Sequence, residues 1–187
     1  MKKLIVSIIS LSVIALAGCG STVTEPTQTV PDYNTVTAAI TEYEDAYREF
    51  VNGGEGEVQF VTGTSETPLG APCDIRYSRT TDGRFESCSL TVTRDREEHD
   101  EYMNVSPDLM LFVRTFVDDE AELIQIDKYI CTGGAVYHIN PETQTLEPVE
   151  DVTALDCFIT FSQVRTAYGP SGSEDPAAAL SETQVAA

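Results

Sequence analysis

The sequence predicts an α+β fold in which one N-terminal helix packs on a curved, mostly antiparallel sheet of about seven strands. Two observations lead to this fold class. Residues 36–51 repeat apolar side chains at helical spacing, whereas the chain after Gly54 consists of short alternating segments separated by turn residues. Strands joined by short turns pair as antiparallel neighbours, and a single helix can cover one face of the resulting sheet.

The helix is expected to begin near Asn34 or Thr35, either of which can cap its first turn, and to end at Gly53. Acidic residues occupy mostly the opposite side, so the apolar stripe is expected to face the core. Its tyrosines are interpreted as core residues rather than as a ligand platform. The stripe consists of Val36, Ile40, Tyr43, Tyr47, Phe50 and Val51.

The first hairpin is expected to join Cys73–Thr80 to Phe85–Thr93 through the turn Asp82-Gly83. A two-residue loop fixes which residues face each other, and apolar residues then meet apolar ones. In this register the two cysteines of the hairpin lie four residues out of step, about 13 Å along the strand. The predicted pairs are Cys73 with Val92, Ile75 with Leu90, Tyr77 with Cys88, and Arg79 with Glu86.

Five more segments have the composition of strands. Leu109–Val117 is apolar on both faces, which predicts a central strand covered on both sides. The run from Asp95 to Glu101 is interpreted as a charged loop. The other expected strands are Val58–Thr62, Leu123–Cys131, Ala135–Ile139 and Phe158–Val164.

The first eighteen residues have the composition of a secretory signal. Lys2 and Lys3 precede an apolar run from Leu4 to Leu16, and no acidic residue occurs before Glu25. A membrane-spanning helix needs about 20 apolar residues, so this run is too short to span a bilayer. We therefore expect it to be cleaved.

The residues at the end of this run resemble the lipobox of bacterial lipoproteins: Leu16-Ala17-Gly18-Cys19. The resemblance implies that Cys19 is lipidated and becomes the first residue of the mature chain. Acyl chains on one cysteine would make a stable anchor. The following Gly20 implies the outer membrane of a Gram-negative cell, or otherwise the outer face of the cell membrane. The alternative is an ordinary signal peptide with a chance cysteine.

The resulting organisation has four parts. Residues 1–18 are a signal peptide, 19–33 a flexible tether, 34–168 a single α+β domain, and 169–187 a disordered tail rich in small residues.

The charge is strongly acidic. The chain carries a net charge of −20, which becomes −22 once Lys2 and Lys3 leave with the leader. Such a surface repels nucleic acid and anionic lipid headgroups, so neither is an expected partner of the domain surface. A solvated acidic exterior or a cationic partner fits this charge.

No catalytic, metal-binding or cofactor-binding motif is evident. His99 and His138 have no ligand spacing, the cysteines form no C-x-x-C pair, and the acidic runs match no EF-hand. No nucleophile elbow and no phosphate loop occur. We therefore expect no catalytic residue, no metal and no cofactor, and an enzyme would require titratable residues that converge in a cleft.

An even number of cysteines in an exported domain predicts two disulfides. The predicted register excludes a bond between Cys73 and Cys88, because a disulfide requires Cα atoms within about 7 Å. Each of these two is therefore expected to pair with Cys131 or Cys157.

The segment from Tyr129 to Thr143 is similar to a hairpin in carriers of the periplasmic lipoprotein-chaperone type. Those proteins fold a half-barrel sheet over a helix and hold acyl chains inside. Two functions are therefore considered. The first is a membrane-anchored envelope lipoprotein whose domain has a non-catalytic binding or structural role, with an unidentified protein partner. The alternative is a carrier of a small apolar ligand in a cavity between the sheet and the helix, near Tyr43 and Tyr47.

Overall fold

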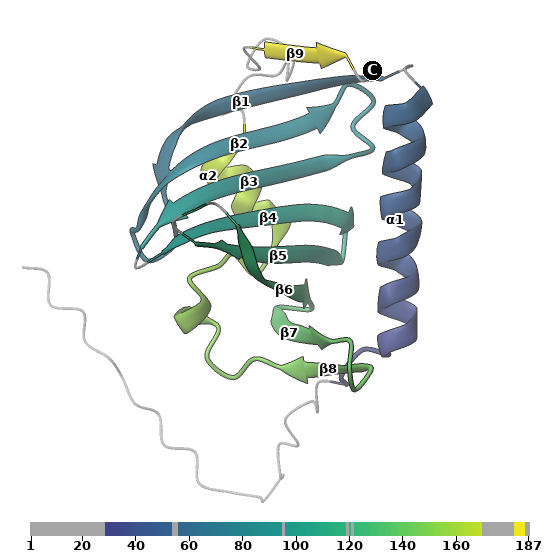
Figure 1. The fold of residues 1–187 in the computed structure, drawn as a ribbon. Coiled ribbons are helices and arrows are strands. Elements are labelled where there is room, and N and C mark those ends of the chain that lie inside the picture. Colours follow the sequence, from purple (N-terminus) through teal and green to yellow (C-terminus); the bar gives the residue numbers. More distant parts are fainter. Residues whose placement is uncertain are drawn as a thin grey trace, which may run out of the picture.

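The computed structural model describes residues 29–53, 56–94, 96–118, 120, 122–169 and the strand 182–185. The expected signal peptide, Cys19 and most of the tether lie outside these residues. The domain starts with α1 (Tyr33–Gly53) and continues as one antiparallel sheet (Figure 1). The α+β class with an antiparallel sheet is therefore confirmed.

The sheet is a meander in which β1 to β8 follow one another in space as they do in sequence, with β9 added beside β1 (Figure 1). All neighbouring strands run antiparallel. The strands are β1 (Glu57–Glu66), β2 (Pro72–Thr80), β3 (Glu86–Thr93), β4 (Glu97–Ser106), β5 (Leu109–Val117), β6 (Leu123–Thr132), β7 (Ala135–Asn140), β8 (Thr145–Pro148) and β9 (Glu182–Val185).

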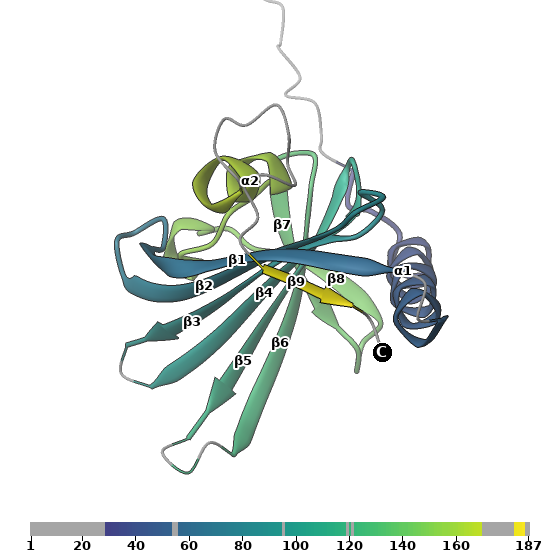
Figure 2. The ribbon, with the colours of Figure 1, turned by 90° about the horizontal axis from the view of Figure 1, so that it is seen from above.

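The two faces of the sheet carry separate apolar clusters because successive strand residues point to opposite sides. Leu111 belongs to the cluster under α1, together with Val36 and Ile40. Its neighbour Phe112 belongs to the larger cluster on the other face. That face is covered by η1 (Thr153–Leu155) and α2 (Phe161–Tyr168), whose position away from α1 is visible in Figure 2. The first part of β5 is covered on both sides, as its sequence predicts, whereas Thr115 and Val117 near its end stay partly exposed.

Helix α1 forms where its apolar stripe predicts. Its first turn, however, is capped by Asp32 rather than by Asn34 or Thr35. The Asp32 carboxylate accepts hydrogen bonds from the backbone N–H of Thr35 at 2.8 Å and from its hydroxyl at 2.8 Å. These bonds lower the pKa of Asp32. Aspartate at this position satisfies an N–H that has no partner within the helix.

The register of the first hairpin is confirmed in full. Cys73 faces Val92, Ile75 faces Leu90, Tyr77 faces Cys88 and Arg79 faces Glu86. The turn that fixes it places Gly83 at φ +71°, a conformation that a residue without Cβ adopts readily.

The interpretation of Asp95–Glu101 as a charged loop is wrong, because most of it belongs to β4. Glu98 and Asp100 point into the α2-side core and are 8% and 1% exposed. They are tolerated there because Arg114 on β5 pairs with both and Arg94 donates to Glu98 as well. From sequence alone, a run of charged residues is expected to be exposed to solvent. In β4, however, the alternate residues Glu98 and Asp100 are buried and paired with arginine.

The C-terminal part also differs from expectation. Phe158–Val164 is not a strand, because Thr160 caps α2 within it. The Thr160 hydroxyl accepts from the Gln163 N–H, and the Gln163 side chain accepts from the Thr160 N–H. This reciprocal capping box was present in the sequence as Thr-x-x-Gln. The strand β8 was not expected, and β9 lies within the tail predicted to be disordered.

The two predicted disulfides are not formed. All four cysteines are free and buried, and all belong to the core cluster on the α2 side. They pack there as small apolar side chains. The Cys131 thiol lies 3.7 Å from the carbonyl oxygen of Phe158 and donates to it. Burial raises the pKa of Cys88 to about 12 and that of Cys157 to about 11.

Candidate functional site

A cleft of about 610 Å³ opens on the α2 side of the sheet. Three elements form its walls: the turn from β4 to β5, the turn from β6 to β7, and the first turn of α2. This volume is typical of sites for small ligands. The lining residues are Asn104, Ser106, Pro107, Asp108, Leu109, Met110, Cys131, Thr132, Gly133, Gly134, Ile159, Thr160, Phe161, Ser162 and Arg165.

The lining combines an apolar strip with polar groups. Met110, Ile159 and Phe161 supply the apolar part, and Asp108 and Arg165 bring charge of both signs. A second hollow of about 420 Å³ adjoins the cleft across Gly134 and Ile159. The two hollows together suit an amphiphilic ligand or a short stretch of peptide.

One ionic contact fixes the wall formed by α2. Arg165 donates to both oxygens of the Glu86 carboxylate, with N–O distances of 3.0 Å from Nε and 2.5 Å from Nη2. Tyr77 donates to the same carboxylate. Burial by itself raises the pKa of Glu86, but these bonds outweigh burial and lower it. The contact therefore holds α2 against β3 and partly neutralises the guanidinium that borders the cleft.

Asp156 fixes the wall of the second hollow. Its carboxylate accepts from the Thr67 hydroxyl at 2.5 Å, the Leu69 N–H at 2.6 Å and Arg94 at 2.7 Å. These bonds lower the pKa of Asp156 against the effect of burial. Asp156 is 6% exposed, and its backbone has a φ of +49°. Its side chain thus connects the segment before α2 to the loop after β1 and to the end of β3.

A deeper ion pair lies in the core of the α2-side face. Arg114 binds both oxygens of Asp100 at 2.7 Å each, and its Nε lies 3.7 Å from a Glu98 oxygen. Burial opposes the charge of Arg114, but the hydrogen bonds to Asp100 raise its pKa overall. These groups stabilise the fold and do not line either hollow.

The two histidines lie on different strands and outside both hollows. The Nδ1 atom of His99 lies 3.2 Å from the Thr91 hydroxyl, and its Nε2 atom lies 2.9 Å from a carboxylate oxygen of Glu97. Its neighbour Asp100 points to the opposite face, so the adjacent pair forms no dyad. His138 lies 3.6 Å from Glu147. Over the described ranges, no three His, Cys, Asp or Glu side chains gather in a way that could hold a metal ion.

The space between α1 and the sheet is filled by aromatic rings. Tyr43, Tyr47 and Phe50 surround Phe85 with centroid distances of 5.5, 5.2 and 5.5 Å. The remaining void is about 50 Å³, a volume on the scale of one or two water molecules. An acyl chain does not fit there.

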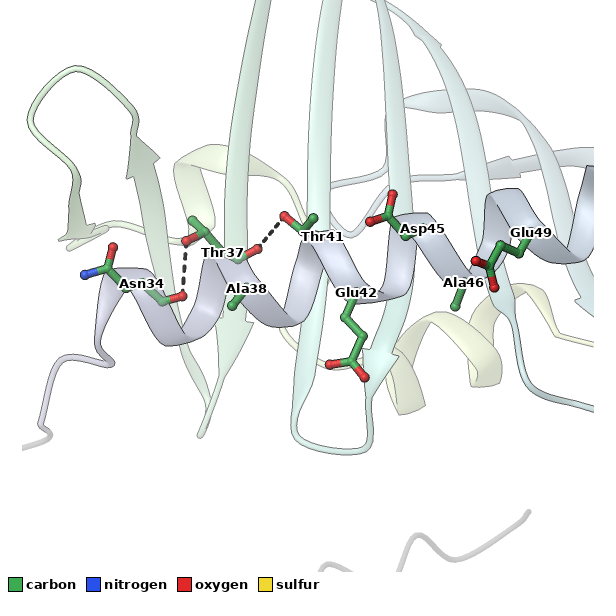
Figure 3. A pocket seen from close by; sticks show the side chains of 8 residues that line it. All are labelled: Asn34, Thr37, Ala38, Thr41, Glu42, Asp45, Ala46 and Glu49. Carbon is green, nitrogen blue, oxygen red and sulfur yellow. Dashed lines mark hydrogen bonds between the residues drawn. The ribbon is translucent and has the colours of Figure 1, made fainter.

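The outer surface of α1 carries a shallow hollow shown in Figure 3. All eight residues that line it come from this one helix, and no other element among the described residues contributes to it. Three of them, Glu42, Asp45 and Glu49, are acidic. This surface is a solvated helix face rather than an enclosed site.

The sequence singled out few residues of the cleft. Of the four core cysteines, Cys131 lines the cleft and Cys157 lines the adjoining hollow. The sequence gives no local signal that Arg165 and Asp156 border these hollows. The capping box of α2 does, however, predict the helix that positions Arg165. No protein-family model, no curated protein and no solved structure matches this chain.

Proposed function

We propose that this chain is the precursor of a lipid-anchored envelope protein whose single domain binds a partner and catalyses no reaction. Its leader and the lipobox-like Leu16-Ala17-Gly18-Cys19 support export and anchoring. Helix α1 begins at Tyr33, and we propose that the residues between Cys19 and this helix serve as a short tether. No helix within the described part of the chain is long and apolar enough to cross a membrane.

The observation that supports binding is the pair of adjoining hollows with fixed walls. Their charged neighbours Glu86, Arg165 and Asp156 are held in ion pairs that secure α2 and the segment before it. Rigid walls around an apolar strip favour recognition, because little conformational entropy is lost on binding. The carrier alternative is less well supported, because the void between α1 and the sheet is only about 50 Å³.

Replacing Cys19 by serine is expected to abolish the anchor. Without its thiol no thioether to lipid can form, and several acyl chains would be lost at once. The measurement is partition of the expressed protein between a detergent phase and water, with Ser21→Ala as the matched control. We expect wild type and control in the detergent phase and Cys19→Ser in water or unprocessed. Equal partition of all three would refute the anchor.

The cleft is expected to bind an amphiphilic anion such as anilinonaphthalene sulfonate. The rings would lie on the apolar strip around Ile159, with the sulfonate near Arg165. The measurement is dye fluorescence against concentration, with cooperative unfolding checked for each protein. Ser162→Trp should fill the cleft and abolish saturable binding, whereas Thr166→Trp, exposed on the same helix outside the cleft, should leave it unchanged. Equal binding by both variants would exclude the cleft as the site.

A further inference from the structure

The hairpin of β5 and β6 exposes apolar side chains that no part of the described structure covers. Leu123, Ile124 and Ile126 are 57%, 52% and 50% exposed. In Figure 2 the free end of this hairpin lies away from both helices. Half of the large apolar side chains that are exposed in the described residues thus fall within four positions of one strand. Such a concentration marks an interaction surface.

The exposed side chains lie mainly on one face. Val113 packs with the α1 cluster, so Thr115, two residues farther, points to the same face. Ile126 pairs with Thr115 and shares that face, but α1 does not reach it. On the opposite face, the guanidinium of Arg96 covers the ring of Phe116 at 3.7 Å. The uncovered apolar face is therefore the continuation of the one that α1 covers.

The same part of β6 has an unpaired edge. β5 pairs with β6 from Leu123 onward, whereas β7 pairs only with Tyr129–Thr132. Within the part of the chain that the structure describes, no strand pairs with Leu123–Lys128 on the β7 side. Six residues of strand present roughly 20 Å of backbone donors and acceptors. An edge of this kind accepts an added strand.

The charges around this edge select the partner. Asp118, Glu120 and Glu122 are exposed at the hairpin end, and Asp127 is half-buried on β6. The one basic side chain of this edge, Lys128, lies 3.8 Å from Glu44 of α1. A second copy of the chain would carry the same net charge of −20 and would be repelled as a whole. An extended segment with basic side chains instead complements the carboxylates.

We infer that β6 residues Leu123–Lys128 bind an extended segment of a partner protein by adding a strand to the sheet. The segment alternates apolar and basic side chains, so that the apolar ones cover Ile124 and Ile126 while the basic ones meet the acidic rim. This inference deepens the proposed binding function, and it does not depend on the α2-side cleft.

The test uses the full chain in a mild detergent and a capped hexapeptide of alternating valine and lysine. Binding should slow hydrogen exchange at the amides of Leu123–Lys128 and should saturate. The double variant Ile124→Lys/Ile126→Lys should weaken binding at least tenfold, because it removes the apolar contact and repels the peptide. Val30→Lys, which changes an exposed apolar residue elsewhere, should bind as the wild type does.

Two altered peptides make the test specific. Methylation of alternate backbone nitrogens removes the donors that a strand needs, and replacement of lysine by glutamate reverses the charge. Both should bind at least tenfold more weakly. Equal binding of either peptide, absence of protection in Leu123–Lys128, or dimerisation through this edge would overturn the inference. Detergent partition of Cys19→Ser reports on the anchor separately, so the two proposals fail independently.

Discussion

Replacing Arg114 by methionine is expected to lower the free energy of unfolding by about 3–5 kcal/mol, the usual cost of leaving one charge of a buried pair alone. Asp100 is 1% exposed and receives both of its hydrogen bonds from this guanidinium, at 2.7 Å each. Glu98 also loses a nearby cation. Methionine keeps much of the volume, so the loss reflects charge rather than a cavity. Denaturant unfolding measures it.

Two further variants separate this cost from a general effect of losing arginine. The double variant Asp100→Leu/Arg114→Met should recover most of the stability, since no unpaired charge remains at this position. Arg48→Met removes an exposed arginine that pairs with Asp45, and should cost less than about 1 kcal/mol. A loss below about 1 kcal/mol for Arg114→Met would show that the Asp100 carboxylate is hydrated or protonated in the fold.

Replacing Asp156 by alanine is expected to cost about 2–4 kcal/mol, because three hydrogen bonds to a buried carboxylate disappear together. Thr67 loses its acceptor, and Arg94 keeps only Glu98 as a partner. Alanine must also adopt the left-handed conformation at φ +49°. Hydrogen exchange should accelerate in residues 149–169, which this side chain ties to the sheet. Asp151→Ala, which removes a single exposed contact with the N–H of Ala154, is the matched control.

The same residue should make stability depend on pH. The pKa of Asp156 is lower in the folded protein than its ordinary value, so the unfolded chain binds a proton more readily. Its contribution is therefore fully present above the ordinary pKa, about 4, and is lost as the pH falls through the lowered folded pKa. The stability difference between wild type and Asp156→Ala should begin to shrink below about pH 5 and should keep shrinking until the pH has passed the lowered folded pKa. A constant difference would mean that Asp156 does not ionise.

The elements that the sequence predicts well are those whose pattern is local. The dipeptide Asp82-Gly83 predicts the turn and, with it, the pairing of Ile75 with Leu90, although the loop between Thr80 and Phe85 has four residues rather than two. Helix α1 and strand β5 are also predicted by local patterns: apolar residues at helical spacing from Val36 to Phe50, and a run that is apolar on both faces in β5. In each case the residues that determine the structure are close together in the chain.

The remainder depends on contacts between distant residues. The sequence of β4 favours a charged loop, because the partner that allows Asp100 to be buried is Arg114, 14 positions away. The cleft requires Arg165 to meet Glu86, 79 positions away. Neither partner can be recognised from its own neighbours. Phe158–Val164 is a different case, because its apolar composition favours a strand whereas the local capping box of Thr160 and Gln163 starts a helix there.

The intact mass of the protein, purified from the membranes of cells that express the full gene product, tests the central proposal most directly. If the chain is a lipid-anchored envelope protein, its mass corresponds to residues 19–187 plus a lipid modification, and fragmentation places that modification on Cys19. A chain that retains Met1, or one that begins elsewhere with an unmodified Cys19, would contradict it.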